Sequence, residues 1–487
     1  MAAFRRRDVL KVGILAMLMT EGIAATTLAA RRPSVGRPDY TLRIGRGDVE
    51  VAPGKTITTK TYNGQFPGPL LRFTEGKTTR VDVYNDTDTP EQLHWHGQRV
   101  PVDVDGSAEE GTPFVPPHGM RRLLFSPGPS GFRFYHTHLG AGADLTGGQY
   151  SGQVGPVYIE PRREPGAYDR EVFLTLKEFE PTLNQDEEMS SDFLAGEPVA
   201  DLRDKGERAM AVSAATGMPH GYEIGYGTFT INGRSLGHGE PIQVNFGDRI
   251  LLHVLNGSAT ENRSLALPGH TFTVVALDGN PVAKPVAVPV LWLGTGERIS
   301  ATVQMTNPGV WILGDLSDDD RRAGMGVVVE YGGRTGNPRW APPPPFRWDY
   351  RLFAAPEQRP PAVDQVIDLL IEKRNAASNG FNIWTINGAA FSMDMQPVID
   401  IAYGKRYRLR FRNASDDLHP MHLHRHSFDI THVAGTSTTG IRKDVAMLGG
   451  YQRMDVDFHA DQRGLSLLHC HQQLHMDFGF MTLLRCS

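Results

Sequence analysis

The sequence predicts an all-β protein made of three consecutive β-sandwich domains. Glycine (53 residues) and proline (34 residues) are frequent, which favours many short strands joined by turns over long helices. Apolar and polar residues alternate in short segments, as Val81 and Val83 do within residues 78–85, and this pattern is typical of half-buried strands. An Asn-Gly pair recurs at a similar place in three sections of the chain, which indicates three copies of one sandwich unit (Asn63-Gly64, Asn232-Gly233 and Asn387-Gly388).

Chain length and linkers set the expected domain boundaries. A chain of 487 residues is long enough for three domains of ~150 residues each. We expect these domains to comprise residues 31–162, 163–336 and 337–487. Residues 160–166 are predicted to link the first two domains, and the proline-rich residues 337–345 to form a stiff, extended linker before the third.

Residues 1–30 are predicted to be a targeting segment and not part of the fold. Arg5, Arg6 and Arg7 precede an apolar run that is too short to remain as a membrane-spanning helix. The stretch from Arg6 to Lys11 resembles a bacterial twin-arginine signal, which exports proteins that are already folded. We therefore expect a periplasmic or secreted protein that uses the twin-arginine export machinery. An amphipathic or membrane-anchoring N-terminus is the alternative.

Charge and cysteine content exclude two classes of protein. The net charge is −5 and no run of Lys or Arg follows residue 11, which argues against nucleic-acid binding. With only two cysteines the chain has no disulfide framework. Cys486 is the penultimate residue and is expected to lie in a frayed C-terminus.

The first domain carries two histidine pairs with the same spacing. His94 and His96 are two residues apart, as are His136 and His138. In an extended segment, residues at this spacing point to the same face. The strand pattern of residues 153–159 then closes the domain.

The middle domain repeats the strand pattern without paired histidines. Residues 228–233, 249–255 and 309–313 read as strands. Four scattered histidines are interpreted as core or surface residues, so the domain is predicted to be a metal-free spacer (His220, His238, His253 and His270). Residues 183–218 are poorly patterned and are predicted to be a long loop or a short helix.

The third domain holds the densest cluster of potential metal ligands. An alternating strand at residues 405–411 leads to His419, His422 and His424. Near the C-terminus, the apolar residues 464–468 read as a strand that enters the core and continues into His469, Cys470 and His471, with His475 close behind. In a strand His469 and His471 face one way and Cys470 the other.

These side chains predict two kinds of metal site. A cysteine thiolate with imidazoles is the ligand set of blue-copper electron-transfer sites, so Cys470 would connect one copper to a second copper group behind it. Ten histidines and one cysteine are enough for four coppers with open positions for oxygen. Because the histidine motifs lie at both ends of the chain, we expect the first and third domains to meet.

Taken together, the four motifs resemble those of the multicopper oxidases, the family of laccases, ascorbate oxidases and bacterial copper-tolerance oxidases. The resemblance covers nearly the whole chain after residue 30, including residues 63–69. It implies three cupredoxin-like Greek-key domains and four coppers per chain. Carried over by motif, it implies these ligands: type 1 copper, His419, Cys470 and His475; type 2 copper, His94 and His422; type 3 coppers, His96, His136 and His471 on one, and His138, His424 and His469 on the other.

The resemblance also implies a function. Such an oxidase takes single electrons from a small reducing substrate, a phenol or an aromatic amine, through an exposed edge of His475 or His419. Cys470 then passes the electrons to the trinuclear cluster, where O2 is reduced to water. No covalent substrate intermediate is needed, and we expect a monomer.

Two features depart from the family pattern, the axial position of the type 1 copper and the proton-donating carboxylate. The axial position of the type 1 copper falls on Phe480, which would not ligate and would raise the copper's potential; a shift of one residue would recruit Met481. The positions of the family's proton-donating carboxylate hold Gln473 and Met476. Asp105 matches the family's acid near the type 2 copper, although it could instead be an ordinary turn aspartate.

Three other functions compete with the laccase-like one. A metal oxidase acting on Cu(I), Mn(II) or Fe(II) is the main alternative, although the 16 methionines form no methionine-rich insert. The pair Met393 and Met395 is interpreted as packing. A copper-free cupredoxin scaffold is the distant alternative, because such scaffolds have lost the ligands. A copper nitrite reductase fits poorly, because it has fewer domains and lacks the His-Cys-His triplet.

Overall fold

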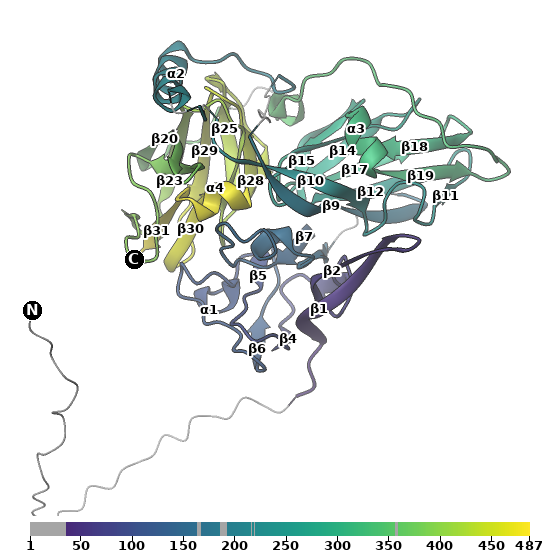
Figure 1. Cartoon of the computed structure of the whole chain (residues 1–487), viewed down its shortest axis with the longest axis horizontal. Coiled ribbons are helices and arrows are strands. Elements are labelled where there is room, and N and C mark those ends of the chain that lie inside the picture. Colours follow the sequence, from purple (N-terminus) through teal and green to yellow (C-terminus); the bar gives the residue numbers. More distant parts are fainter. Residues whose placement is uncertain (1–35, 163–166, 186–191, 216, 219, 356–358) are drawn as a thin grey trace, which may run out of the picture. The chain divides into compact units, whose positions relative to one another are not determined.

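The computed structural model describes residues 36–162, 167–185, 192–215, 217–218, 220–355 and 359–487. The predicted targeting segment, residues 1–30, lies outside them. The fold is contained in the unit Pro38–Ser487 and is nearly all β, which confirms the predicted fold class (Figure 1). No helix among the described residues is both long and apolar enough to cross a membrane.

The first domain is a sandwich of two four-stranded sheets, ordered β2-β1-β4-β6 and β3-β8-β7-β5. Alternate residues of both sheets point inward, and Leu42, Val81, Phe73 and Trp95 meet in one buried cluster. Its elements are β1 (Tyr40–Ala52), β2 (Lys55–Tyr62), β3 (Leu71–Thr74), β4 (Thr79–Asn85), β5 (His94–His96), α1 (Val102–Asp105), β6 (Met120–Phe125), β7 (Gly131–His136), the 3-10 helix η1 (Gly148–Tyr150) and β8 (Val154–Glu160).

The middle domain has a large sheet, β10-β9-β12-β17-β14-β15, and two smaller ones, β11-β19-β18 and β13-β16. Its elements are β9 (Arg170–Asn184), α2 (Ala200–Ala214), β10 (Glu223–Ile231), β11 (Ile242–Val244), β12 (Arg249–Asn256), β13 (Arg263–Leu265), β14 (Phe272–Leu277), β15 (Asn280–Val288), β16 (Leu291–Leu293), β17 (Arg298–Gln304), β18 (Val310–Gly314), α3 (Asp318–Ala323) and β19 (Gly326–Tyr331). Helix α2 lies in the segment where a loop or short helix was predicted, and its Asp201 and Lys205 pair with Arg412 and Glu372 of the third domain.

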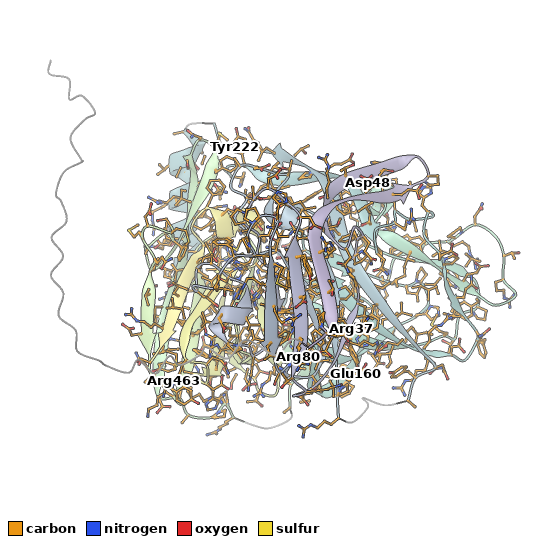
Figure 2. All side chains as sticks on the ribbon, turned by 90° about the horizontal axis from the view of Figure 1, so that it is seen from below. Arg37, Asp48, Arg80, Glu160, Tyr222 and Arg463 are labelled. Carbon is orange, nitrogen blue, oxygen red and sulfur yellow. The ribbon has the colours of Figure 1, made fainter. Side chains whose placement is uncertain are left out.

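The third domain packs the sheet β21-β20-β23-β29-β25-β26, to which β27 adds, against the sheet β22-β31-β30-β24-β28. Its elements are the 3-10 helix η2 (Tyr350–Phe353), β20 (Gln365–Ser378), β21 (Phe381–Ile386), β22 (Val398–Ile401), β23 (Arg406–Asn413), β24 (His419–Leu423), β25 (Phe428–Val433), β26 (Thr436–Ser437), β27 (Arg442–Lys443), β28 (Val445–Leu448), β29 (Arg453–His459), β30 (Gly464–Cys470), α4 (Gln473–Asp477) and β31 (Met481–Cys486). Figure 2 draws the described side chains on the ribbon, with Tyr222 and Arg463 among those labelled.

Each domain opens with the same strand arrangement. The first strand pairs antiparallel with the next strand and parallel with a later one: β1 with β2 and β4, β9 with β10 and β12, and β20 with β21 and β23. Asn63, Asn232 and Asn387 all adopt a left-handed conformation, with φ of 57°, 53° and 52°. Each of these side chains accepts a hydrogen bond from one backbone N–H of the first strand and donates one to a backbone carbonyl of that strand. The threefold repeat is confirmed, whereas the exact domain boundaries stay a prediction.

The C-terminus differs from the expectation. The prediction of a frayed end is wrong, because β31 pairs with both β22 and β30 inside the second sheet of the third domain. Cys486 is 4% exposed and belongs to the hydrophobic core. Side chains alternate between the two faces of a strand, and Cys486 lies on the same face as Leu484, in the same core cluster.

Candidate metal centres

Cys470 ends β30 with its side chain in the core of the third domain. Its Sγ lies 3.7 Å from Nδ1 of His419, at the start of β24, and 3.5 Å from Nδ1 of His475, in α4. The strands β24 and β30 are paired, which holds the two ends of this group together. All three side chains are fully buried. The structure therefore brings together the three residues that the sequence assigned to a type 1 copper.

The chemistry of this first group suits a soft metal ion. Burial raises the pKa of the Cys470 thiol, so the sulfur would not ionise without a cation beside it. Burial likewise lowers the pKa of His419 and His475 well below the usual value, which keeps both imidazoles neutral. Ser415 Oγ lies 2.9 Å from Nε2 of His419, which leaves Nδ1 turned to the sulfur.

Phe480, and not Met481, lies on the Cys470 side of the strand pair. The Phe480 ring centroid is 4.8 Å from that of His419, and the residue belongs to the same core cluster as Cys470. Met481 packs into a different cluster with Leu467 and Met476. Adjacent residues of a strand point to opposite faces, so only one of the two can face the sulfur.

The expected exposed histidine edge is wrong. His419 and His475 are both 0% exposed. The indole of Trp384, on β21, packs against both rings, with centroids 4.3 Å from His475 and 4.8 Å from His419. Sequence reasoning missed Trp384, because nothing near it in the chain distinguishes it from a core tryptophan.

The other face of β30 contributes to two all-histidine groups. His469 joins His138 and His424, and its Nε2 lies 3.0 Å from Nε2 of His424. His471 joins His96 and His136. These six histidines lie in or just after β5, β7, β24 and β30, so the groups join the first and third domains, as the sequence predicted; β5, β7 and β30 are labelled in Figure 1.

His94 stacks on His424 of the first all-histidine group and His422 on His96 of the second, and His94 and His422 lie with their ring centroids 5.8 Å apart. They form a further potential metal group with His96, and His94 also lies beside His424. All eight histidines of the combined cluster are buried, and their ligand atoms lie within 4.8 Å of one another in each group. None of the described residues of the middle domain belongs to such a group; its His253 and His270 are hydrogen-bonded to Ser300, Glu171, Pro268 and Tyr331.

Hydrogen bonds fix which nitrogen each ring offers. In His136, His422 and His469, Nδ1 donates to a backbone carbonyl 2.7–2.8 Å away, which leaves Nε2 for a ligand. His96 is reversed: its Nε2 lies 3.1 Å from Asp444 Oδ1 and its Nδ1 has no hydrogen-bond partner among the described residues. The Nε2 atoms of His94, His136 and His422 have none either. Buried nitrogens without partners are costly in a protein, and metal coordination would satisfy them.

Burial also keeps most of these imidazoles neutral, which is the form that binds metal. It lowers the pKa of His469 to about 3 and moves those of His96, His136, His422, His424 and His471 well below the usual value. His138 is the exception: burial lowers its pKa, but the hydrogen bond and charge of Glu109 outweigh burial and the pKa is raised.

Asp105 lies beside the histidine cluster, as the motif predicted. It ends the one-turn helix α1 and is fully buried. Its Oδ2 lies 2.9 Å from His424 Nδ1 and 3.2 Å from His94 Nδ1, so it contacts two predicted ligands. Gly106 follows with φ of 96°, and a side chain there would collide with the backbone of Leu93.

Two neighbouring acids were missed by sequence reasoning. Glu110 Oε1 lies 3.4 Å from His424 Nδ1, and Glu109 Oε2 lies 3.4 Å from His138 Nδ1. Burial, and then repulsion from Asp105, raises the pKa of Glu110 well above its usual range. The only sequence signal for these two acids was that they are adjacent to each other and lie a few residues after Asp105.

Asp477 takes a structural role at the domain junction. Its Oδ2 accepts hydrogen bonds from the backbone N–H groups of Ala141 and Gly142, at 2.9 and 2.8 Å. Its Oδ1 accepts one from Gln473 Nε2 at 2.8 Å. Helix α4, which carries His475, is thereby attached to the first domain.

Comparison with known proteins agrees with this geometry. Three family models, each described as multicopper oxidase, match residues 43–164, 200–326 and 358–486. The chain is 30% identical to multicopper oxidase MmcO of Mycobacterium tuberculosis, over 96% of this chain and 90% of that protein. It is 24% identical to a copper resistance protein A homolog of Pseudomonas syringae pv. tomato (93% and 94% covered) and 24% identical to Laccase-1 of Agaricus bisporus (94% and 91% covered).

Solved structures show the same fold. The crystal structure of a multi-copper oxidase from Pseudomonas thermotolerans superimposes with a TM-score of 0.69 and 24% identity, covering 92% of this chain and 98% of that one. That of Fet3p, a multicopper oxidase that functions in iron import, gives a TM-score of 0.74 at 17% identity, covering 92% and 90%. The chain belongs to the multicopper oxidase family, whose members are copper-dependent oxidoreductases that use O2 and reducing substrates.

Proposed function

We propose that the protein is a laccase-like oxidase that couples one-electron oxidation of a small reducing substrate, a phenol or aromatic amine, to the reduction of O2 to water. The position of Cys470 carries this proposal. Its sulfur faces His419 and His475, while its neighbours His469 and His471 belong to the histidine cluster behind it. One short peptide thus joins two groups of different chemistry.

The proposal assigns four coppers to the eleven side chains. His419, Cys470 and His475 would hold the type 1 copper, and His94 and His422 the type 2 copper. His96, His136 and His471 would hold one type 3 copper, with His138, His424 and His469 on the other. Copper in the first group would supply a one-electron acceptor, and copper in the cluster a binding site for O2.

Residues of the protein would supply the protons for oxygen reduction and the path for electrons. One O2 becomes two waters by taking up four electrons and four protons, so four molecules of a one-electron donor are oxidised per turnover. Asp105 Oδ1 and Glu110 Oε2 are buried carboxylate oxygens with no hydrogen-bond partner among the described residues, beside the cluster. Burial and then repulsion from Asp105 raise the pKa of Glu110, so Glu110 can hold a proton there. Burial also raises the pKa of Asp105, but the charge and hydrogen bond of His94 outweigh burial and lower it, so Asp105 can take up a proton and pass it on. Because Trp384 covers the two type 1 histidines, electrons from a surface donor must pass its indole or an adjacent side chain.

The primary test is metal content together with a visible spectrum. We expect about four coppers per chain and a strong thiolate-to-copper band near ~600 nm. Cys470→Ser should abolish the band and the oxidation of a phenol while the protein stays folded, because Cys470 is the only thiolate in the groups. Phenol oxidation at the wild-type rate by this variant would refute the assignment.

A second candidate function is the oxidation of Cu(I), and one observation favours it. The interpretation of Met393 and Met395 as packing residues is wrong, because they are 58% and 64% exposed. Their loop is attached to the type 1 segment, since Phe391 N–H donates to the Gly479 carbonyl at 3.0 Å. Thioethers are soft ligands that prefer Cu(I).

One double variant can distinguish Cu(I) oxidation from phenol oxidation. If Cu(I) is oxidised at this loop, replacing both Met393 and Met395 with Leu should slow Cu(I) oxidation and leave phenol oxidation unchanged. Met120→Leu is the matched control, since Met120 is also exposed, at 37%, and lies on the first domain. Equal Cu(I) oxidation by the double variant and this control would reject the loop as a Cu(I) site.

We also propose export of the folded protein by the twin-arginine route, on the basis of Arg6 and Arg7. Lys at both positions should retain the protein in the cytoplasm. Normal appearance in the periplasm or medium would argue for another route.

A further inference from the structure

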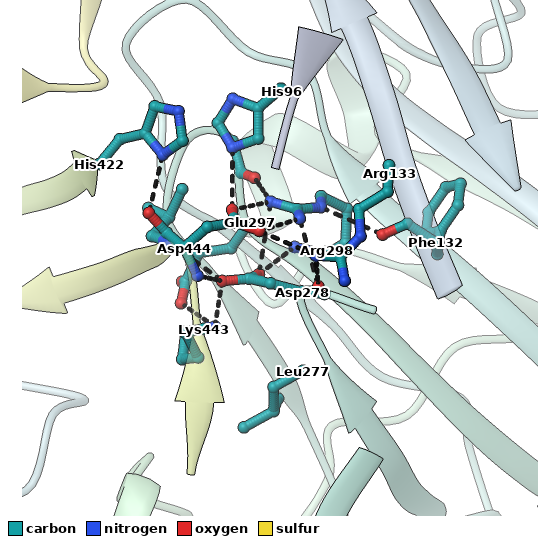
Figure 3. A network of polar contacts seen from close by, with 12 residues as sticks. His96, Phe132, Arg133, Leu277, Asp278, Glu297, Arg298, His422, Lys443 and Asp444 are labelled. Carbon is teal, nitrogen blue, oxygen red and sulfur yellow. Dashed lines mark hydrogen bonds and ion pairs between the residues drawn. The ribbon is translucent and has the colours of Figure 1, made fainter. Parts of the chain in front are cut away.

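A buried network of charges lies where the three domains meet (Figure 3). Its cations and anions are equal in number, and every member is at most 2% exposed. The first domain contributes Arg133, the middle domain Asp278, Glu297 and Arg298, and the third domain Lys443 and Asp444.

Asp444 is the centre of this network and touches two of the proposed copper ligands. Its carboxylate accepts a two-pronged hydrogen bond from Arg298, with Nη1 to Oδ1 at 2.6 Å and Nη2 to Oδ2 at 2.7 Å. Arg133 Nη1 donates to Oδ2 at 3.0 Å. On the other side, Oδ1 lies 3.1 Å from His96 Nε2, and the Asp444 carbonyl accepts from His422 Nδ1 at 2.7 Å.

The middle domain holds Asp444 from behind as well. Asp278 Oδ2 accepts hydrogen bonds from the backbone N–H groups of Asp444 and Val445, at 3.2 and 3.1 Å. Lys443 Nζ lies 3.0 Å from Asp278 and 2.9 Å from Glu297. Residues 443–445 are therefore held to the ends of β14 and β17 by charge and by backbone hydrogen bonds.

The network approaches the histidine cluster so closely that two positions have no room for a side chain and are glycine. A Cβ at Gly97, beside His96, would lie 2.5 Å from Asp444 Oδ2 and 2.7 Å from Arg298 Nη2. A Cβ at Gly296, in the middle domain, would lie 2.9 Å from the His471 ring. Both glycines have positive φ, 74° and 77°. The middle domain therefore contacts the cluster directly, although it supplies no ligand among its described residues.

Stability alone gives a weak reason for such a network. Buried ion pairs lose as much hydration as they gain in attraction, and well-packed apolar side chains of similar size would serve at least as well. A two-pronged arginine–carboxylate pair does provide fixed geometry. The geometry here determines which nitrogen His96 turns to the cluster, because Asp444 occupies its Nε2 and leaves Nδ1 free.

We propose that Arg298 and Asp444 form a clamp through which the middle domain positions His96 and His422 for copper. The inference rests on the proposed function, because it takes these two histidines as copper ligands. Arg298 and Asp444 are positioning residues: neither contacts the reacting atoms. The middle domain is then a required part of the trinuclear site and more than a spacer.

The test replaces Arg298 with Met and measures copper at each site. Loss of an outer partner of a ligand weakens metal retention by about 10- to 100-fold. Against a copper chelator, Arg298→Met should therefore release the type 2 and type 3 coppers at correspondingly lower chelator concentration, and its type 2 electron paramagnetic resonance signal should change. The thiolate-to-copper band of the type 1 site should persist, because that site does not touch the network.

Arg263→Met is the matched control. Arg263 is also a buried arginine of the middle domain, at 2% exposed, and is paired with Glu178, but it touches no proposed ligand. A general loss of stability would affect both variants, whereas a clamp predicts selective copper loss only in Arg298→Met. Full retention of all four coppers by a folded Arg298→Met, with an unchanged type 2 signal, would overturn the proposal.

Asp444→Asn tests the clamp in a second way and is the variant to use if Arg298→Met does not fold. Asn has nearly the same shape and retains an oxygen that His96 can reach, but it loses the charge that holds Arg298. We expect it to retain the type 2 and type 3 coppers better than Asp444→Ala does. Equal retention by these two variants at the wild-type level contradicts the clamp. Wild-type protein that binds no copper at the histidine cluster would instead refute the proposed function itself.

Discussion

Phe480 determines what completes the coordination of the proposed type 1 copper. Its ring packs on His419, and a phenyl group offers no lone pair to a metal. A copper held only by two imidazoles and a thiolate has a higher potential than one with an axial thioether. We therefore predict that Phe480→Met lowers the type 1 potential, as measured by redox titration of the thiolate-to-copper band.

Met481→Leu is the matched control for this change. Met481 packs with Leu467 and Met476, away from Cys470, so its replacement should leave the potential nearly unchanged. A large shift on changing Met481, with none on changing Phe480, would show that the two residues are exchanged in solution.

Asp105 is predicted to deliver protons for oxygen reduction. It touches His94 and His424. Asp105→Asn should slow reoxidation of the reduced enzyme by O2 by ~10²-fold, the typical effect of a positioned proton donor. Reduction by substrate should hardly change. Stopped-flow measurement of the two half-reactions separates these steps.

Asp103→Asn serves as the comparison for Asp105→Asn. Asp103 lies on the same one-turn helix but is exposed to solvent. It should keep both rates. If Asp105→Asn also keeps both, protons enter by another group, and Glu110 is the next to replace because it lies 3.4 Å from His424.

For individual residues, the sequence predicted the eleven proposed ligand side chains, which the structure brings together in groups, but it did not predict the residues around them. His-x-His pairs and the His-Cys-His triplet are local patterns whose geometry follows from the strand they sit on. Glu110 contacts His424, Asp444 contacts His96 and Trp384 contacts His475, and each of these contacts joins two segments that are separated in the chain, so only the folded arrangement shows them.

Individual strands were predictable where alternation was regular. Residues 79–85 form β4, where apolar and polar residues alternate, whereas residues 249–255 and 464–468 lie in β12 and β30 as short apolar runs. The last strand, β31, was missed because its apolar residues occur next to the chain end, where fraying is the usual expectation. Pairing with β22 and β30 overrides that expectation.

Burial of Cys486 in β31 leads to a prediction at the scale of this element. Cys486→Ser exchanges a buried thiol for a more polar hydroxyl, although the Ala460 carbonyl, 3.8 Å from Sγ, can accept its hydrogen bond. We expect a loss of about 1 kcal/mol in the free energy of unfolding, measured in urea, with unchanged copper content and oxidase rate. Loss of the blue colour in a folded Cys486→Ser would show that β31 positions Cys470 more tightly than its pairing suggests.

The molecule as a whole builds one site from two domains and supports it with the third. The histidine groups draw on β5 and β7 of the first domain and on β24 and β30 of the third. Contact between the first and third domains was predictable, because a metal cluster built from all four histidine motifs requires both ends of the chain. The contribution of the middle domain was not, since Asp278, Glu297 and Arg298 resemble ordinary charged residues until the fold brings them together.

The two centres of the molecule should respond differently to pH during copper loading. Copper binding requires deprotonated ligands and releases whatever protons they hold. Burial raises the pKa of the Cys470 thiol, so this centre gives up one proton and its apparent affinity should fall ~10-fold for each unit of pH decrease. Burial lowers the pKa of six imidazoles of the cluster, to about 3 for His469, so these six are already neutral and release almost no protons (His96, His136, His422, His424, His469 and His471).

Copper loading of metal-free protein tests which of the two centres loses copper affinity more steeply as the pH falls. Competition with a chelator at pH 7.5, 6.5 and 5.5 should weaken the type 1 site, followed by its visible band, more steeply than the type 2 site, followed by electron paramagnetic resonance. His138, whose pKa is raised by Glu109 despite burial, should add a proton to the cluster, and Glu109→Gln should remove that contribution. If both centres weaken with the same steep slope, the cluster histidines are protonated in the metal-free protein, and water must reach a site that the structure shows as buried.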